Sequence, residues 1–101
     1  MSSSFTNFSS PALRQMSHTD YTCTTSFAIV VNPRVLPERR VIVVIQNKSA
    51  TAVLEVLFST QGTAGLFIPP NQTISLENYN GSVRLKSDTA GSIAHIAIGS
   101  V

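Results

Sequence analysis

Residues 40–47 read RVIVVIQN and carry the strongest strand signal in the chain. Its β-branched residues are typical of a strand, in which successive side chains point to opposite faces. The odd-numbered apolar residues of the stretch therefore share one face, and Ile42 and Val44 share the other. Because both faces are apolar, we expect one to lie on the core and the other against an arm or a second subunit.

Further strands with turn signals between them flank this stretch. The turn NKSA leads from it into residues 51–59, TAVLEVLFS, which we expect to complete a hairpin. The other expected strands lie within residues 21–31, 66–72, 73–78, 82–87 and 92–101. About seven short strands at such spacing predict an all-β domain, a small antiparallel β-sandwich or jelly roll.

Residues 1–20 are rich in Ser and Thr, and their few apolar residues follow neither a helical nor a strand period for long. We interpret them as an extended N-terminal arm, and residues 21–101 as a single β-sandwich domain. Phe5 and Phe8 lie three positions apart in this polar tail. Two aromatic residues in such a setting suggest anchors that dock onto a neighbouring molecule.

The composition favours an assembly. Hydrophobic residues make up 43% of the chain and charged residues 12%, about half the usual charged share. A small domain with so few charges is a natural candidate for an oligomer. The Asn-x-Ser/Thr triplets, such as Asn47 to Ser49, are interpreted as turn chemistry, since the N-terminus resembles no signal peptide.

The net charge of +2 argues against a nucleic-acid partner, which needs many cations on one face. The local cluster Arg34, Arg39 and Arg40 is interrupted by Glu38. It indicates a solvated loop or an ion-pair site between subunits. No stretch approaches the roughly 18 apolar residues that span a bilayer, so we expect no membrane partner.

The chain offers few groups for catalysis. His18, Asp20 and Cys23 form an H-x-D-x-x-C run, but a zinc site needs four organised ligands, which are not offered elsewhere. His95 lies among apolar neighbours and is interpreted as a structural residue, with a pH switch at a subunit contact as the alternative. Cys23 is the sole cysteine, so no intrachain disulfide forms and a small buried residue is expected. We therefore expect no catalytic, metal or cofactor-binding residues, and no enzyme.

Several motifs after residue 38 carry a family resemblance. They are RRVIVVIQNKS (39–49), VLEVLF (53–58), GLFIPPNQT (65–73) and NGSVRLKSDTAGSIAHIAI (80–98). In this order they resemble small β-rich accessory proteins of tailed-phage virions, of the head decoration or cement, vertex or fibre-base type. The resemblance implies a place in the virion after assembly in the host cytoplasm, with the major capsid protein as partner and no cofactor.

The leading hypothesis is a structural virion protein that forms a homo-oligomer, a trimer or higher, and bridges capsid subunits. The candidate subunit contacts are Phe5, Phe8, Leu13, Met16, Arg34, Arg39, Arg40, Ile42 and Val44. The alternative is a carbohydrate- or receptor-binding β module of a phage tail or spike. For that alternative, Tyr79 and Phe67 are the aromatic residues near loops.

Overall fold

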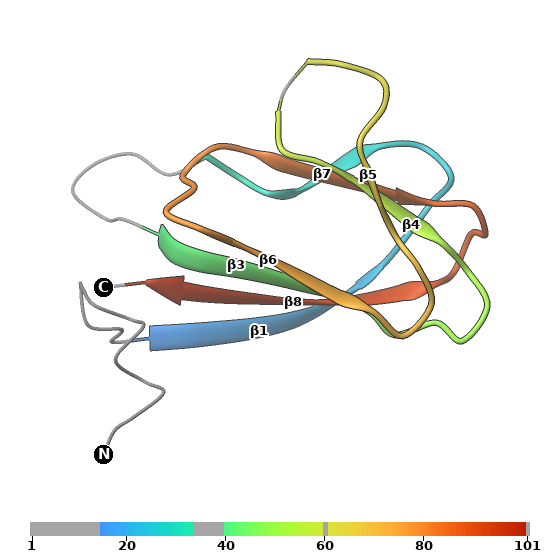
Figure 1. The fold of residues 1–101 in the computed structure, drawn as a ribbon, viewed down its shortest axis with the longest axis horizontal. Coiled ribbons are helices and arrows are strands. Elements are labelled where there is room, and N and C mark those ends of the chain that lie inside the picture. The colour runs from blue at the N-terminus through green and yellow to red at the C-terminus, as the bar shows by residue number, and fades with distance from the viewer. Residues whose placement is uncertain (1–14, 34–39, 60, 101) are drawn as a thin grey trace.

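A computed structural model describes residues 15–33, 40–59 and 61–100, and these residues form two four-stranded antiparallel sheets packed face to face (Figure 1). The strands are β1 (Gln15–Thr22), β2 (Ala28–Val31), β3 (Arg40–Asn47), β4 (Leu54–Leu57), β5 (Leu66–Ile68), β6 (Thr73–Glu77), β7 (Val83–Ser87) and β8 (Ile93–Ser100). The expected all-β sandwich is confirmed, with eight strands.

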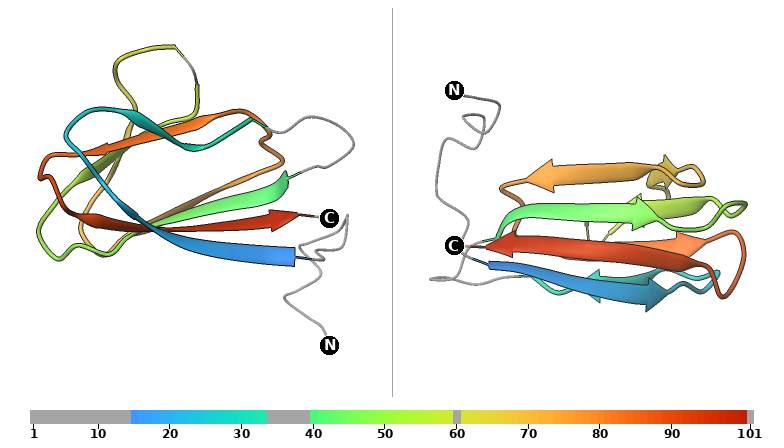
Figure 2. Two further views of the ribbon diagram at one scale, coloured as in Figure 1. Left: turned by 180° about the vertical axis from the view of Figure 1, so that it is seen from behind. Right: turned by 90° about the horizontal axis from the view of Figure 1, so that it is seen from below.

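The strand order is that of a jelly roll. One sheet, here called the first sheet, has the order β1-β8-β3-β6, and the second sheet has the order β2-β7-β4-β5. Figure 2 shows the four strands of the first sheet side by side when the molecule is seen from below. Most consecutive strands lie in different sheets, so the chain crosses the sandwich repeatedly and its core is closed by non-local pairing.

The hairpin expected between residues 40–47 and 51–59 is wrong. β3 pairs with β8 and β6 on its two sides, while β4 pairs with β5 and β7 in the other sheet. Both edges of β3 are therefore occupied by distant strands. The short turn after Asn47 carries the chain from one sheet to the other instead of folding it back alongside.

The core lies between the two sheets, as the alternation of β3 predicted. Val43 and Ile45 on its inner face are 1% and 0% exposed, and Leu54 and Val56 of β4 are fully buried opposite them. The remaining buried members of the cluster are Cys23, Val31, Ile68, Val83, Leu85, Ala94 and Ile96. Burial of these apolar side chains from both sheets is the main force that holds the layers together.

The strand expected within residues 21–31 is divided between the two sheets, because β1 ends at Thr22 and β2 begins at Ala28. The first strand also begins earlier than the sequence indicated. β1 starts at Gln15 and pairs with β8 along its whole length, from Gln15 opposite Ser100 to Thr22 opposite Ile93. Residues 15–20 therefore belong to the sheet and not to an arm, which corrects the boundary expected at Tyr21. β1 is a mostly polar edge strand that is held by backbone hydrogen bonds to β8. Its sequence therefore shows no alternation of apolar residues that would predict a strand. Residues 1–14 lie outside the described part of the chain.

Candidate functional site

The outer face of the first sheet carries apolar side chains on β1 and β3, the two strands that flank β8. Met16 of β1 and Ile42 of β3 both pair with Gly99 of β8, and Val44 pairs with Ala97 one row away. Residues paired in an antiparallel ladder present their side chains to the same face. Since Val43 and Ile45 face the core, Met16, Ile42 and Val44 form one patch on the outside, here called the outer patch.

The outer patch departs from the usual pattern of an antiparallel sheet, whose exposed face is polar. Met16 is 45% exposed, while Ile42 and Val44 are partly buried. A single exposed apolar residue needs no explanation, but Met16 together with the partly exposed Ile42 and Val44 makes a group of apolar side chains on one outer face. The patch is therefore suited to contact with another molecule.

The structure thus brings together three of the nine expected contact residues. Arg40 begins β3 with its backbone opposite Ser100, at an irregularity in the register before Ile42. The other candidates, Phe5, Phe8, Leu13, Arg34 and Arg39, lie outside the described residues.

A polar cluster lies on the same outer face, beside the outer patch. His18 Nδ1 and His95 Nε2 are 2.9 Å apart, and their rings are stacked with centroids 5.1 Å apart. His95 Nδ1 is 2.7 Å from Asp20 Oδ1, and Lys48 Nζ is 3.5 Å from Asp20 Oδ2. The order along the face is Lys48, Asp20, His95, His18, and we call this group the histidine cluster.

Electrostatics define the proton positions in the histidine cluster. The hydrogen bond from His95 lowers the pKa of Asp20 below its ordinary value, and the positive charge of Lys48 lowers it further. The carboxylate is therefore ionised at neutral pH and only accepts, so His95 carries a proton on Nδ1. When both imidazoles are neutral, His95 Nε2 accepts a hydrogen bond from the Nδ1–H of His18.

His18, Asp20 and Cys23 are close in sequence, but the structure separates Cys23 from the other two. Cys23 is 1% exposed in the core, as expected, and burial raises the pKa of its thiol. His18 and Asp20 share the outer face because they are two residues apart in one strand. Their third partner is His95, 77 residues from His18, and only the pairing of β1 with β8 places it there.

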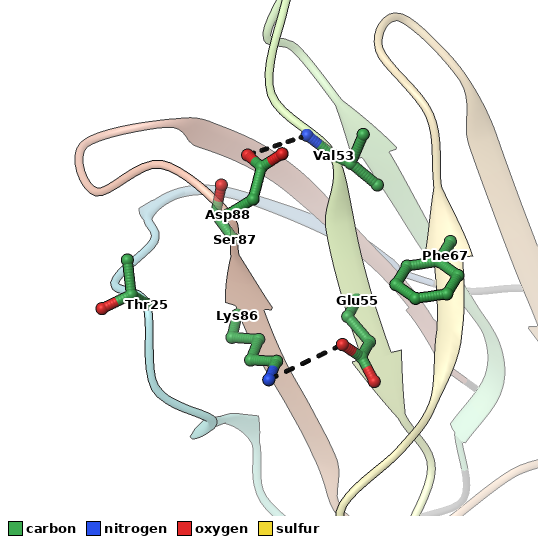
Figure 3. A pocket seen from close by; sticks show the side chains of 7 residues that line it. All are labelled: Thr25, Val53, Glu55, Phe67, Lys86, Ser87 and Asp88. Atoms are coloured by element: carbon green, nitrogen blue, oxygen red, sulfur yellow. Dashed lines mark hydrogen bonds and ion pairs between the residues drawn. The ribbon is translucent and has the colours of Figure 1, made fainter.

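The outer face of the second sheet holds a shallow pocket of about 320 Å³, shown in Figure 3. It is lined by Thr25, Val53, Glu55, Phe67, Lys86, Ser87 and Asp88. Glu55 Oε1 lies 3.7 Å from Lys86 Nζ, and Asp88 Oδ1 accepts a 3.1 Å hydrogen bond from the Val53 backbone. The ring of Phe67, which is 68% exposed, forms the apolar wall.

Two further exposed apolar residues were not among the expected contacts. Ile29 of β2 is 54% exposed and Leu66 of β5 is 60% exposed, both on edge strands of the second sheet. The signal for β5 is its sequence LFIPP, since two prolines after three apolar residues favour a short edge strand.

Tyr79 does not serve as an exposed ring. Its hydroxyl donates a 2.6 Å hydrogen bond to the Ser82 carbonyl, and its ring packs edge-on against Phe58 at the margin of the core. Of the two aromatic residues considered for sugar binding, Phe67 alone is highly exposed.

Within residues 15–33, 40–59 and 61–100, no group of three or more His, Cys, Asp or Glu side chains is arranged to hold a metal ion. In the same described residues, no helix has the length and apolar character needed to cross a membrane.

Comparisons with known proteins identify a similar fold. No protein-family model matches the sequence, and no curated protein matches it. Among solved structures, the chain is similar to one described as "Bacillus endospore appendages form a novel family of disulfide-linked pili", with a TM-score of 0.65 and 12% identity. The match covers 85% of this chain and 82% of the other. At this identity the likeness concerns the fold.

Proposed function

We propose that this chain is a non-enzymatic structural subunit that assembles with further copies of itself through the outer face of the first sheet. The observation that carries the proposal is the outer patch, in which Met16, Ile42 and Val44 occupy adjacent rows where an isolated sandwich would present polar residues. Charged residues make up only 12% of the chain, so few charged side chains are present to keep this face in contact with water.

The usual size of a stable contact sets what this face must supply. Such a contact buries about 800 Å² on each partner, so residues around the outer patch must take part in it as well. Each apolar side chain in the patch gains about 25 cal/mol for every Å² removed from water. The candidate contacts in residues 1–14 would extend the same interface, because that segment directly precedes β1 and Met16.

On this proposal the assembly is held without covalent links. The similar solved structure is described as a disulfide-linked pilus. Here the sole cysteine, Cys23, is buried in the core and cannot reach a neighbouring chain without unfolding. Apolar and polar contacts are left to provide the association.

The resemblance in residues 39–98 supports one kind of assembly, a virion. In a virion the chain would act as a decoration, cement or vertex component that bridges capsid subunits. The fold likeness to an appendage subunit supports the broader class of structural proteins. Negative-stain electron microscopy of the assembled protein separates the two. Closed rings or trimers are expected for a decoration protein, and filaments would replace that proposal with an appendage.

The test of self-association is Val44→Arg, which introduces a charge at the centre of the outer patch. Light scattering coupled to size exclusion should show a homo-oligomer for the unaltered chain and a monomer for the variant. The matched control is Thr63→Arg, which adds the same charge at an exposed loop position of the second sheet. A monomeric unaltered chain, or a Val44→Arg variant that still assembles, would contradict the proposal.

A second candidate function is carbohydrate or receptor binding by the pocket of the second sheet. The exposed ring of Phe67 beside Glu55, Lys86 and Asp88 offers an apolar platform with polar groups around it, the combination that sugars require. A glycan array should show hits that disappear in Phe67→Ala and persist in Ile29→Ala. An array without hits would remove this candidate.

A further inference from the structure

We propose that His18 and His95 form a binding site for a late first-row divalent metal ion, Cu²⁺ above all, on the outer face of β1 and β8. The two imidazole nitrogens, His18 Nδ1 and His95 Nε2, come from strands distant in sequence and point to each other at 2.9 Å. Neutral imidazole is a favoured ligand of copper, nickel and zinc.

Asp20 supplies the support that such a ligand needs. Histidine ligands usually donate their remote N–H to a carboxylate, which fixes the ring and raises the basicity of the metal-binding nitrogen. The 2.7 Å contact between His95 Nδ1 and Asp20 Oδ1 is this arrangement. It leaves Nε2 of His95 as the nitrogen with a lone pair, directed at His18. Asp20 is therefore a positioning residue of the site.

The nitrogens already lie close enough to share one ion. Their 2.9 Å separation is the length of the hydrogen bond between the rings, while two bonds of 2.0–2.1 Å place ligand nitrogens roughly 2.9 Å apart at a right angle and roughly 3.3 Å apart at the tetrahedral angle. The spacing therefore does not select the geometry of the ion, and the preference for Cu²⁺ follows from its place at the top of the affinity order of these metals. Once the Nδ1 proton of His18 has left, small rotations of both rings turn the two lone pairs toward a shared ion.

The charge balance allows binding near neutral pH. His18 must release the proton on Nδ1, and the same ring takes one up on Nε2, so the neutral pair loses no net proton. Asp20 faces His95 from β1, with Lys48 as its cationic partner, while the neighbour of His95 on β3 is the uncharged Gln46. Two protein ligands leave the other positions of the ion to water, because this face is exposed.

The experiment is a titration of the untagged full chain with CuCl₂ by calorimetry, with electron paramagnetic resonance of the bound ion. We expect saturable binding with two imidazole nitrogens in the spectrum. His18→Gln and His95→Gln should each weaken binding at least about tenfold, and Asp20→Asn by about ten- to a hundredfold. Gln46→Ala, on the same face, is the control and should bind as the unaltered chain does.

A measurement on the unaltered chain guards against variants that fail to fold. In nuclear magnetic resonance spectra, substoichiometric Cu²⁺ should broaden signals of β1 and β8 around His18 and His95 first. Broadening centred elsewhere, a spectrum with one nitrogen ligand, or full affinity in a folded His18→Gln/His95→Gln variant would overturn the proposal. Zinc binding as tight as copper binding would contradict the preference for Cu²⁺.

Discussion

Asn47 at the end of β3 donates a 2.9 Å hydrogen bond from its amide nitrogen to the carbonyl oxygen of Ile68 at the end of β5, and thereby joins the two sheets. The same nitrogen donates to the Ala52 carbonyl at 2.8 Å, and Asn47 Oδ1 accepts from the Ser49 backbone at 2.9 Å. The side chain is fully buried. It adds to the backbone hydrogen bonds at this crossing, in which Lys48 N–H donates to the Ile93 carbonyl and Asn71 N–H to the Ser49 carbonyl.

Asn47→Ala should lower the free energy of unfolding by about 3 kcal/mol, because three buried hydrogen bonds at about 1 kcal/mol each are lost. Urea denaturation followed by circular dichroism measures the change. Gln46→Ala, one residue earlier and exposed, should stay within about 0.5 kcal/mol of the unaltered chain. A loss below about 1 kcal/mol for Asn47→Ala would show that water replaces the amide.

Gly65 is required by a close backbone approach. A Cβ at this position would lie 2.0 Å from the Val56 carbonyl oxygen, and the Gly65 N–H donates to Glu55 Oε2 at 2.7 Å. Gly65→Ala should therefore lower the free energy of unfolding by about 2 kcal/mol or more, since the backbone must move. Gly91→Ala is the comparison: its φ of +91° strains an L-residue but its Cβ meets nothing within 4 Å, so about 1 kcal/mol is expected. Equal losses in thermal unfolding would disprove the steric argument.

Asp20 makes stability depend on acid pH. The hydrogen bond from His95 lowers its folded-state pKa below the unfolded value. The ionised carboxylate thus contributes stability above the unfolded pKa of about 3.9, and this contribution is lost as the pH falls through the folded pKa. We therefore expect the free energy of unfolding, measured with urea between neutral pH and about pH 2.5, to fall less steeply toward acid pH in Asp20→Asn than in the unaltered chain.

The control for Asp20 is Glu77→Gln, which removes one negative charge from β6 at the opposite edge of the same sheet. The Asp20 effect should be small, because its side chain is 52% exposed and solvent screens the ion pair. If the free energy of unfolding fell equally steeply toward acid pH in Asp20→Asn and in the unaltered chain, the stabilising role of ionised Asp20 would be refuted.

Cys23 should be inert in the folded protein. Its side chain is 1% exposed and burial raises the pKa of the thiol, so little thiolate forms at neutral pH. A thiol reagent such as dithionitrobenzoate should react at the rate of unfolding, and rapidly in denaturant. Oxidation of the native protein should yield no covalent dimer on a non-reducing gel. Fast labelling without denaturant would place Cys23 at an accessible surface.

The pattern of apolar residues predicted much of the fold. β3, β6, β7 and β8 lie close to where the sequence placed them, because β6 and β7 alternate apolar and polar residues while β3 and β8 are apolar along most of their length. β1 was missed, since its pairing with β8 depends on backbone groups that any sequence carries. The hairpin expected after Asn47 was wrong because turn signals do not distinguish a reversal within one sheet from a crossing between two.

The candidate site was also predicted from the sequence only in part. Spacing placed Ile42 and Val44 on one face of their strand, where they were proposed as subunit contacts, and Met16 was proposed from its place in a polar segment. The register of β1, β8 and β3 unites them in one patch. The histidine cluster was not foreseen, because a pair 77 residues apart leaves no local pattern.

Hydrophobic periodicity and composition act locally along the chain, so the sequence predicts a charge-poor β domain with one doubly apolar strand at residues 40–47 and a single cysteine. Which strands are neighbours follows from the tertiary pairing. In a jelly roll, pairing joins residues far apart in sequence, so the outer patch and the contact between His18 and His95 exist only once β1 and β3 have closed on β8.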